Sequence, residues 1–309
     1  MKKLVSTLGL PKEEWLKYRK QGIGGSDAGA VCGLNPYRTA MEVYYDKTSE
    51  DIADFDNEAM RQGRELEDYV ATRFAEETGM KVRRANAMFY DEERPYMLAD
   101  VDRMIVGENA GLECKTASPY VADQWADGNI PLSYQIQCHH YMSVCNTDAW
   151  YIAVLIYGRE FKYCRIERDE KLLSDLISIE QDFWENHVLK GELPEPDGSK
   201  TADAVILERF KNSDAATTIT LAGIDTKLSR RAELIEVIER MDREKKKIEQ
   251  ELKLYLGESE IAANEKYRVT WKSIESKRVD DKRLKEERPE VYQEYLKPSV
   301  SRRLMIKAA

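Results

Sequence analysis

The sequence predicts an α/β core, in which a mixed sheet is flanked by helices, followed by an α+β appendage with one long helix. Short β-branched runs joined by glycine-rich turns indicate strands, and stripes such as Leu66, Val70 and Phe74 indicate helices that bury one face. At 309 residues the chain also exceeds the usual size of one domain. A Pro/Gly-rich stretch at 191–199 supplies the boundary, so we predict domains at 1–195 and 200–309.

Residues 97–106 and 112–116 have the pattern of two strands, and the glycine-rich residues 107–111 have the composition of the turn between them. Asp102 and Glu113 stand at similar distances from this turn, so we expect them to lie opposite one another in the hairpin. Because side chains alternate along a strand, Glu113 and Lys115 share one face. The hairpin therefore brings two carboxylates and a lysine together.

This group of side chains predicts metal-dependent hydrolysis of a phosphodiester. Mg²⁺, or Mn²⁺ in its place, prefers oxygen ligands, which Asp102, Glu113 and the backbone carbonyl of Cys114 can supply. Lys115 can hold or deprotonate the attacking water. The alternative is a surface salt bridge without catalytic meaning.

The Glu-x-Lys triplet alone is a weak signal, because it recurs at Glu160/Lys162, Glu244/Lys246, Glu251/Lys253 and Glu275/Lys277. Two of these copies lie in a helical run, where residues i and i+2 diverge and a solvated face is the simpler interpretation. Only the copy at Glu113 has an acidic residue placed opposite it. The context, and not the triplet, points to a metal site.

Four short blocks occur in an order that resembles a known family. They are Arg19-Lys-Gln-Gly-Ile-Gly-Gly-Ser-Asp27, Gly63-Arg-Glu-Leu-Glu67, Val101-Asp102 with Glu113-Cys-Lys115, and Ser133-Tyr-Gln-Ile-Gln137 with Asp148-Ala-Trp-Tyr151. The chain resembles the YqaJ-type viral recombinase nucleases, the lambda-exonuclease group of the PD-(D/E)xK superfamily. The resemblance covers residues 12 to 190 and implies a restriction-endonuclease-like core.

The resemblance implies a role for each matching residue. The metal ligands would be Asp102, Glu113 and the Cys114 carbonyl, and Lys115 would be the active-site lysine. Glu67 would be an acidic helper and possible further ligand at the edge of the site. Gln135 would be the last residue of the motif. Relatives often have glycine after the metal-binding aspartate, whereas this chain has Arg103. Because that side chain should point away from the Asp102 face, we expect little effect on the site.

In the first block, Arg19 and Ser26 fall where the family grips the terminal 5′-phosphate of the strand being digested. The glycine-rich segment 22–25 precedes a short helical run, so free backbone N–H groups also favour a phosphate cradle. An ordinary N-cap is the alternative. In that case Ser26 or Asp27 would satisfy the helix terminus, and Asp27 would repel a phosphate unless a cation intervened.

Composition is consistent with a cytoplasmic enzyme. The five cysteines, Cys32, Cys114, Cys138, Cys145 and Cys164, lack paired C-x-x-C spacing, which favours reduced thiols. No cysteine follows Cys164, which disfavours an iron–sulfur cluster after the core, and the Cys and His residues at 138–145 scatter round a helix axis, which disfavours zinc. The sequence shows neither a signal peptide nor a long apolar run, so membrane attachment is not expected. The formal net charge of -9 conceals a basic C-terminal stretch, so an acidic exterior with a basic DNA-binding lining is possible.

The C-terminal region begins with a long charged helix at 225–256. Its apolar stripe is Leu228, Ile235, Ile238, Met241, Ile248, Leu252 and Tyr255, which is core in most proteins but can also form a hairpin or an oligomer contact. Strands are expected at 260–263, 267–273 and 301–306, with a helix at 280–295 between them. Basic residues such as Arg302 and Arg303 could touch DNA backbone or protein, with solvated surface as the alternative.

The combined expectation is a Mg²⁺-dependent exonuclease that digests double-stranded DNA from 5′ to 3′ and leaves 3′ single-stranded tails for phage-type recombination. By resemblance, relatives form a trimeric ring around DNA and work with a single-strand annealing protein. Two alternatives stay open. One is a structure-specific or restriction-type endonuclease on the same fold, and the other is a catalytically silent scaffold that binds DNA and recruits the annealing partner.

Overall fold

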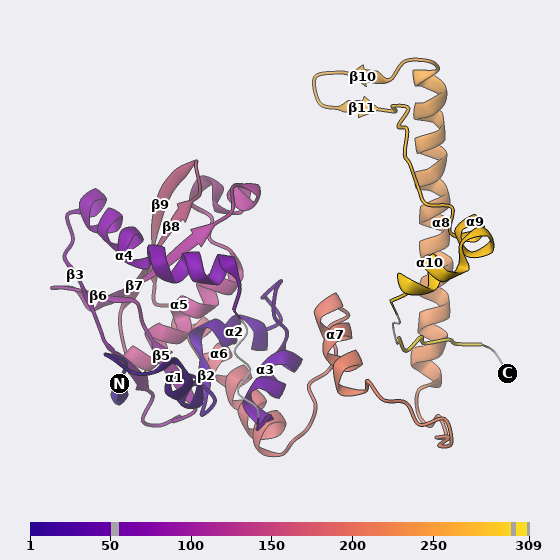
Figure 1. Ribbon diagram of the computed structural model, residues 1–309. Helices are drawn as coiled ribbons and strands as arrows, with labels where there is room; N and C mark the ends of the chain where they lie inside the picture. Colours follow the sequence, from indigo (N-terminus) through magenta and orange to yellow (C-terminus); the bar gives the residue numbers. More distant parts are fainter. Residues whose placement is uncertain (51–55, 298–300, 308–309) are drawn as a thin grey trace. The chain divides into compact units, whose positions relative to one another are not determined.

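The computed structural model describes residues 1–50, 56–297 and 301–307. The chain forms two compact units, Met1–Phe210 and Lys211–Ala309 (Figure 1). The first unit extends beyond the boundary predicted at residue 195, because α7 (Lys200–Arg209) packs on α3 (Ala40–Thr48). In that contact the Arg209 guanidinium lies 5.1 Å from the centre of the Tyr45 ring.

The central sheet of the first unit has five strands in the order β3-β6-β7-β8-β9. β7 and β8 are parallel, and the other neighbours are antiparallel. This is the predicted mixed sheet. Its strands are β3 (Val82–Arg84), β6 (Arg103–Ile105), β7 (Ala110–Ala117), β8 (Ala149–Ile156) and β9 (Glu160–Glu167).

Helices cover both faces of this sheet (Figure 1). On one face, α4 (Glu58–Thr78) packs with Val70 and Phe74 against Leu112 and Tyr151. The other face carries α5 (Leu132–Cys145), and the next residues along the strands, such as Trp150 and Ile152, belong to the core on that side. Because side chains alternate, Glu113 must face α5.

A second, four-stranded sheet has the order β1-β4-β5-β2. Its strands are β1 (Lys2–Ser6), β4 (Ala87–Tyr90), β5 (Met97–Asp100) and β2 (Ile23–Gly24). Residues 97–106, predicted as one strand, are thus two strands in different sheets. The chain changes sheet just before Arg103, at the point where the side chain of Asp102 accepts the Cys114 amide hydrogen at 2.7 Å.

Shorter helices complete the first unit around these layers. They are α1 (Lys12–Arg19), α2 (Gly25–Val31), the 3₁₀ segment η1 (Pro119–Gly128), α6 (Glu170–Asp182) and the wider-turned η2 (Phe183–Leu189). The last two follow one another along the chain without a break.

A buried ion pair ties α5 to α6 and β5. His140 is fully buried, and its Nδ1 and Nε2 atoms lie 2.8 Å from the Glu180 carboxylate and the Leu98 carbonyl. Both partners are acceptors, so the ring must donate from both nitrogens, which requires imidazolium. Burial alone would lower the pKa of His140, but the carboxylate of Glu180 outweighs it and the pKa is raised.

This pair predicts a pH-dependent stability. The pKa of His140 is higher in the folded chain than the unfolded value of about 6.5, so the stabilisation is complete below that pH and is lost as pH rises through the folded-state pKa. Removing one partner of a buried pair costs about 3 to 5 kcal/mol. We expect Glu180→Gln to lower the melting temperature most at acidic pH, with the difference from the wild type shrinking on the alkaline side.

Thermal melts across this pH range test the prediction, with His187→Gln as the control. His187 makes a partly exposed bond to the Glu192 carbonyl, so that variant should keep the wild-type profile. A constant offset between Glu180→Gln and the wild type at every pH would show that His140 is not charged in the fold.

The second unit consists of α8 (Asp225–Leu256), a hairpin of β10 (Ile261–Ala263) and β11 (Arg268–Thr270), and the helices α9 (Asp281–Glu287) and α10 (Pro289–Glu294). The strand predicted at 301–306 is wrong, because these residues have neither helical nor strand structure. The interpretation of the α8 stripe as core is also wrong, since its apolar side chains are largely exposed. None of the described helices is long and apolar enough to cross a membrane.

Candidate active site

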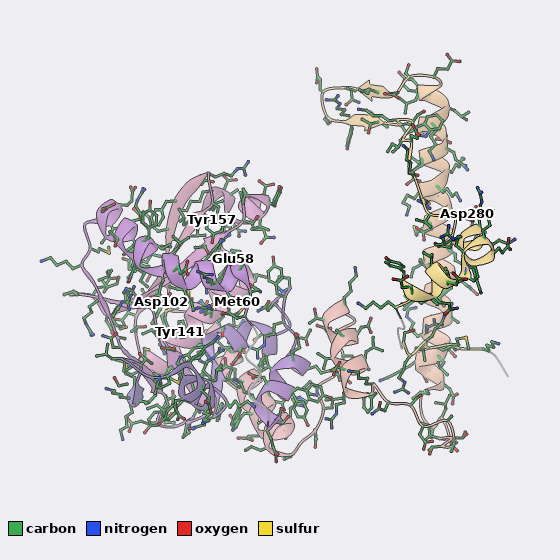
Figure 2. All side chains as sticks on the ribbon, viewed as in Figure 1. Glu58, Met60, Asp102, Tyr141, Tyr157 and Asp280 are labelled. Carbon is green, nitrogen blue, oxygen red and sulfur yellow. The ribbon has the colours of Figure 1, made fainter. Side chains whose placement is uncertain are left out.

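Asp102 and Glu113 lie side by side at the start of the β6–β7 hairpin. The pairing of Arg103 with Leu112 brings their neighbours Asp102 and Glu113 together. The Asp102 side chain is fixed by the bond from the Cys114 N–H to its Oδ2. Figure 2 labels Asp102 within the first unit, close to the label of Tyr141 on α5. The expected opposition of the two carboxylates is therefore present.

Lys115 joins them from the same face of β7. Its Nζ lies 2.6 Å from the Glu113 Oε1 and 4.9 Å from the centre of the Tyr134 ring. Burial alone would lower the pKa of Lys115, but the carboxylates of Glu113 and Asp102 and the Tyr134 hydroxyl raise it above its ordinary value. Lys115 is therefore a protonated hydrogen-bond donor in this site.

Gln137, which is not among the predicted site residues, contacts Glu113. Its Nε2 donates to the Glu113 Oε1 at 2.7 Å and lies 3.1 Å from the Tyr141 hydroxyl. The predicted Gln135 donates instead to the Ile130 carbonyl at the start of α5, and no described bond links it to the carboxylates. Residues two apart on a helix point in nearly opposite directions. The spacing of four between Gln137 and Tyr141 was the available signal, because it places both on one helix face.

The two carboxylates have raised pKa values. Burial is the main cause for Asp102, followed by the charges of Glu113 and Glu67, and its pKa lies well above the ordinary range. Burial also raises the pKa of Glu113, although Lys115 and Gln137 oppose the shift. Carboxylates that resist ionisation in this way are stabilised as anions by a nearby cation. The pair is electrostatically suited to a divalent metal ion.

Glu67 approaches from α4, on the other side of the sheet. Its carboxylate lies 2.5 Å from an Arg103 guanidinium nitrogen, which is also 2.6 Å from the Asp102 carbonyl oxygen. Arg103 also pairs with Asp68 and is 4% exposed. The Arg103 side chain does point away from the Asp102 carboxylate, as alternation predicts, but it contacts two predicted site residues. It holds the predicted acidic helper and the backbone of a predicted ligand.

The residues present fit a divalent cation in one specific respect. The Glu113 Oε2 is buried and has no hydrogen-bond partner in the described part of the chain. An unsatisfied buried carboxylate oxygen is costly, and a cation shared with Asp102 would satisfy it. Within the described residues, no three His, Cys, Asp or Glu side chains form a ready metal cluster. A cation held here would have the two carboxylates and the Cys114 carbonyl as its protein ligands, with Glu67 at the edge of the site.

The predicted phosphate-binding residues also meet. An Arg19 guanidinium nitrogen donates to the exposed Ser26 hydroxyl at 2.9 Å, and the same guanidinium lies 4.8 Å from the centre of the Trp15 ring. Both features fix Arg19 beside Ser26. The structure thus presents a guanidinium and a hydroxyl together at the surface of the first unit.

Asp27 is buried beneath them and neutralised by three cations. Its carboxylate pairs with Lys47 at 2.8 Å, with Arg38, and with Arg19 at 3.5 Å. Burial alone would raise the pKa of Asp27, but these cations lower it far below the ordinary range. Asp27 also accepts the N–H of Gly24, the N-cap residue of α2, at 3.1 Å, so it satisfies the helix terminus from the third helical position and is not itself the N-cap. The cations that a bound phosphate would require beside Asp27 are present.

The Arg19–Ser26 pair adjoins the carboxylate site. A Cβ on Gly25 would lie 2.5 Å from the Tyr141 ring and 3.1 Å from the Gln137 Cγ, so glycine is required where α2 meets α5. On the other side, the Trp15 indole N–H donates to Asp100 at 2.6 Å, two residues before Asp102. One continuous set of contacts therefore connects the two groups of predicted site residues.

Comparison with known proteins supports one family for the whole chain. The profile of the YqaJ-like viral recombinase domain matches residues 14–148. The uncharacterized protein YqaJ of Bacillus subtilis (strain 168) is 38% identical over 308 residues, which cover 98% of this chain and 97% of that protein.

Two solved structures of LHK-Exo share the fold of this chain. The alkaline exonuclease from Laribacter hongkongensis is 17% identical, with a TM-score of 0.51 over 65% of this chain and 99% of its own. Its complex with dAMP is 19% identical, with a TM-score of 0.51 over 58% of this chain and 94% of its own. Because the chain is 38% identical to YqaJ over nearly its full length and also matches the domain profile, it belongs to the YqaJ-like viral recombinase family.

Proposed function

We propose that the protein is a Mg²⁺-dependent exonuclease that digests double-stranded DNA from 5′ to 3′ and leaves 3′ single-stranded tails. One observation carries this proposal. The Asp102–Glu113–Lys115 group is joined through α2 and α5 to the Arg19–Ser26 pair, so the residues proposed to bind a terminal phosphate adjoin those proposed to hydrolyse the phosphodiester. Mn²⁺ is a suitable replacement for the same oxygen ligands.

Each residue has a defined task in this proposal. Asp102, Glu113 and the Cys114 carbonyl would hold the cation, which supplies positive charge to polarise the phosphodiester. Protonated Lys115 donates a hydrogen bond to the attacking water and offsets negative charge on the phosphate in the transition state. Gln137 fixes the rotamer of Glu113 through their 2.7 Å bond. Arg103 holds Glu67 at the edge of the site.

Family and fold support a nuclease acting on DNA. The chain belongs to the YqaJ-like viral recombinases, and the two solved structures that share its fold are of one alkaline exonuclease, LHK-Exo, in one case in complex with dAMP. We extend this to a homo-oligomer, a trimeric ring by resemblance, that acts with a single-strand annealing protein on DNA in the bacterial cytoplasm. Gln135 would act only through the start of α5, where it bonds the Ile130 carbonyl.

The end-binding part of the proposal predicts a preference for phosphorylated ends. A guanidinium binds phosphate with charged, bidentate hydrogen bonds, which a terminal hydroxyl cannot form. One such contact is worth about 1.5 to 3 kcal/mol, so a 5′-phosphorylated duplex should be digested roughly ten- to a hundredfold faster than the 5′-hydroxyl duplex. Arg19→Ala should remove most of that difference. Duplexes labelled on either strand also report which strand disappears.

Arg165→Ala is the matched control. Arg165 is likewise a partly exposed, ion-paired arginine, but it lies on β9 and pairs with Glu108. It should keep the preference for phosphate. Equal digestion of both duplexes by the wild type would remove the phosphate-binding role of Arg19 and Ser26, and loss of the label from the 3′ end first would reverse the proposed polarity.

A further inference from the structure

One side of α8 carries an apolar row whose spacing alternates between three and four residues. We call this row the α8 seam. It consists of Leu234, Ile238, Met241, Ile248, Leu252 and Tyr255, with Lys245 at the one polar position. A mean spacing of 3.5 residues is the repeat that packs one helix along another, and a single lysine in such a row fixes the register of the pair. The spacing therefore indicates a helical partner.

The α8 seam is exposed. Ile238 is 58% exposed, Ile248 53% and Tyr255 82%. A contiguous apolar row of this kind on the surface marks an interaction site. It spans 22 residues, from Leu234 to Tyr255. At 1.5 Å per residue its length is roughly 33 Å. The other described helices of the second unit have seven and six residues, too short to cover it.

Between Met241 and Leu252, the four positions that flank the seam are all acidic. They are Asp242, Glu244, Glu249 and Glu251. Side chains at these positions meet their counterparts on the partner helix and decide which helices pair. Opposite charges attract across such a pair and like charges repel. The flanks therefore favour a partner with basic residues.

The same charges disfavour a second copy of α8. In a parallel pair, Glu244 would face Glu249 of the other copy. In an antiparallel pair centred on the seam, Glu244 would face its own counterpart, and so would Asp242. Both orientations place like charges in contact, and Lys245 would add a buried cation to the core of each.

We propose that the α8 seam binds a helix from a different protein, one that carries apolar residues at the same spacing and lysine or arginine at the flanking positions. An acidic residue of the partner would lie opposite Lys245, which in this chain already pairs with Asp242 at 2.8 Å. The inference does not depend on the proposed nuclease activity, because no residue of the first unit enters it.

Two synthetic helical peptides test this proposal with the full-length protein. Both have isoleucine and leucine at the seam positions; one has lysine at every flanking position, and its twin has glutamate there. Calorimetry should give at least about tenfold tighter binding of the lysine peptide, since each flank contact changes from attraction to repulsion. High salt should reduce that ratio.

Charge-reversal variants show whether the flanks cause the preference. Glu244→Lys with Glu249→Lys should invert it in favour of the glutamate peptide. The matched control is Glu236→Lys with Glu239→Lys, which makes the same charge change on the opposite side of the helix and should leave the preference unchanged. Equal binding of the two peptides, or binding of neither, would overturn the proposal.

A third variant separates a foreign partner from a second copy. Ile238→Asp with Ile248→Asp should abolish peptide binding while the helix content and the sedimentation coefficient stay as in the wild type, because both side chains are exposed. If this variant instead reduces the oligomeric state, the seam pairs copies of this chain with one another, and the proposal is wrong.

Discussion

Replacing either carboxylate of the hairpin, by Asp102→Ala or Glu113→Ala, should abolish Mg²⁺-dependent cleavage of duplex DNA while the protein stays folded. Removing a residue that hydrogen-bonds to a metal ligand already lowers metal affinity or activity about 10- to 100-fold. Removing the ligand itself should therefore lower the cleavage rate more than about 100-fold. The fold should survive because burial and the neighbouring carboxylate already disfavour the charge on Asp102, and removing one of two repelling groups relieves that strain. Nuclease assays and thermal melts without metal measure both effects.

Glu160→Ala is the control for Glu113→Ala. Glu160 belongs to the other Glu-x-Lys triplet of the sheet, on β9, where it pairs with Lys162 at 3.0 Å on the surface. That variant should cleave at the wild-type rate. Wild-type cleavage by either hairpin variant would remove the Asp102–Glu113 pair from the mechanism.

Lys115→Ala should lose at least about 100-fold in turnover, the lower range for a group that assists proton transfer and stabilises transition-state charge. Metal and DNA binding should largely persist, because the carboxylates are unchanged. The variant should also be less stable than the wild type without metal, since the buried Glu113 loses its cationic partner at 2.6 Å, and Mg²⁺ should restore that stability.

Lys162→Ala makes the same change in the surface triplet and should leave turnover unaffected. Single-turnover rates at saturating DNA, with metal affinity measured separately, distinguish the two roles that Lys115 can have. A fall in metal affinity with an unchanged chemical rate would make Lys115 a structural support of the metal site rather than a catalytic group.

The sequence was sufficient for the parts of this site that follow from local periodicity. The glycine-rich turn set the register that brings Asp102 beside Glu113, and strand alternation placed Lys115 with them. Strand alternation also predicted that the Arg103 side chain points to the face of the sheet opposite the Asp102 carboxylate. The mixed sheet with flanking helices followed from the same patterns, and the range of α8 was predicted as well.

The remaining parts depend on contacts between distant segments, which periodicity does not contain. Nothing local signals that the chain changes sheets before Arg103, because residues 97–101 are apolar except for Asp100 and show no regular alternation. The choice between Gln135 and Gln137 depends on how α5 is rotated against β7. Likewise, Arg38 and Lys47 reach Asp27 only after α3 has packed beside α2.

The α8 seam illustrates a different limit. An apolar stripe has the same sequence pattern whether it is covered by its own chain or left for a partner. Only its exposure in the folded chain decided against the interpretation as core. The acidic flanks, which do appear in the sequence, acquire a meaning once the seam is known to be open.

The most direct test of the central claim is to incubate the protein with one plasmid in two forms, linearised and covalently closed, with and without Mg²⁺. An exonuclease that uses the Asp102–Glu113 site needs both an end and the metal. We predict that nucleotides are released from the linear form only when Mg²⁺ is present. The closed circle should stay intact both with and without Mg²⁺. Cleavage of the closed circle would show an endonuclease, and hydrolysis of neither form in Mg²⁺ would contradict the account.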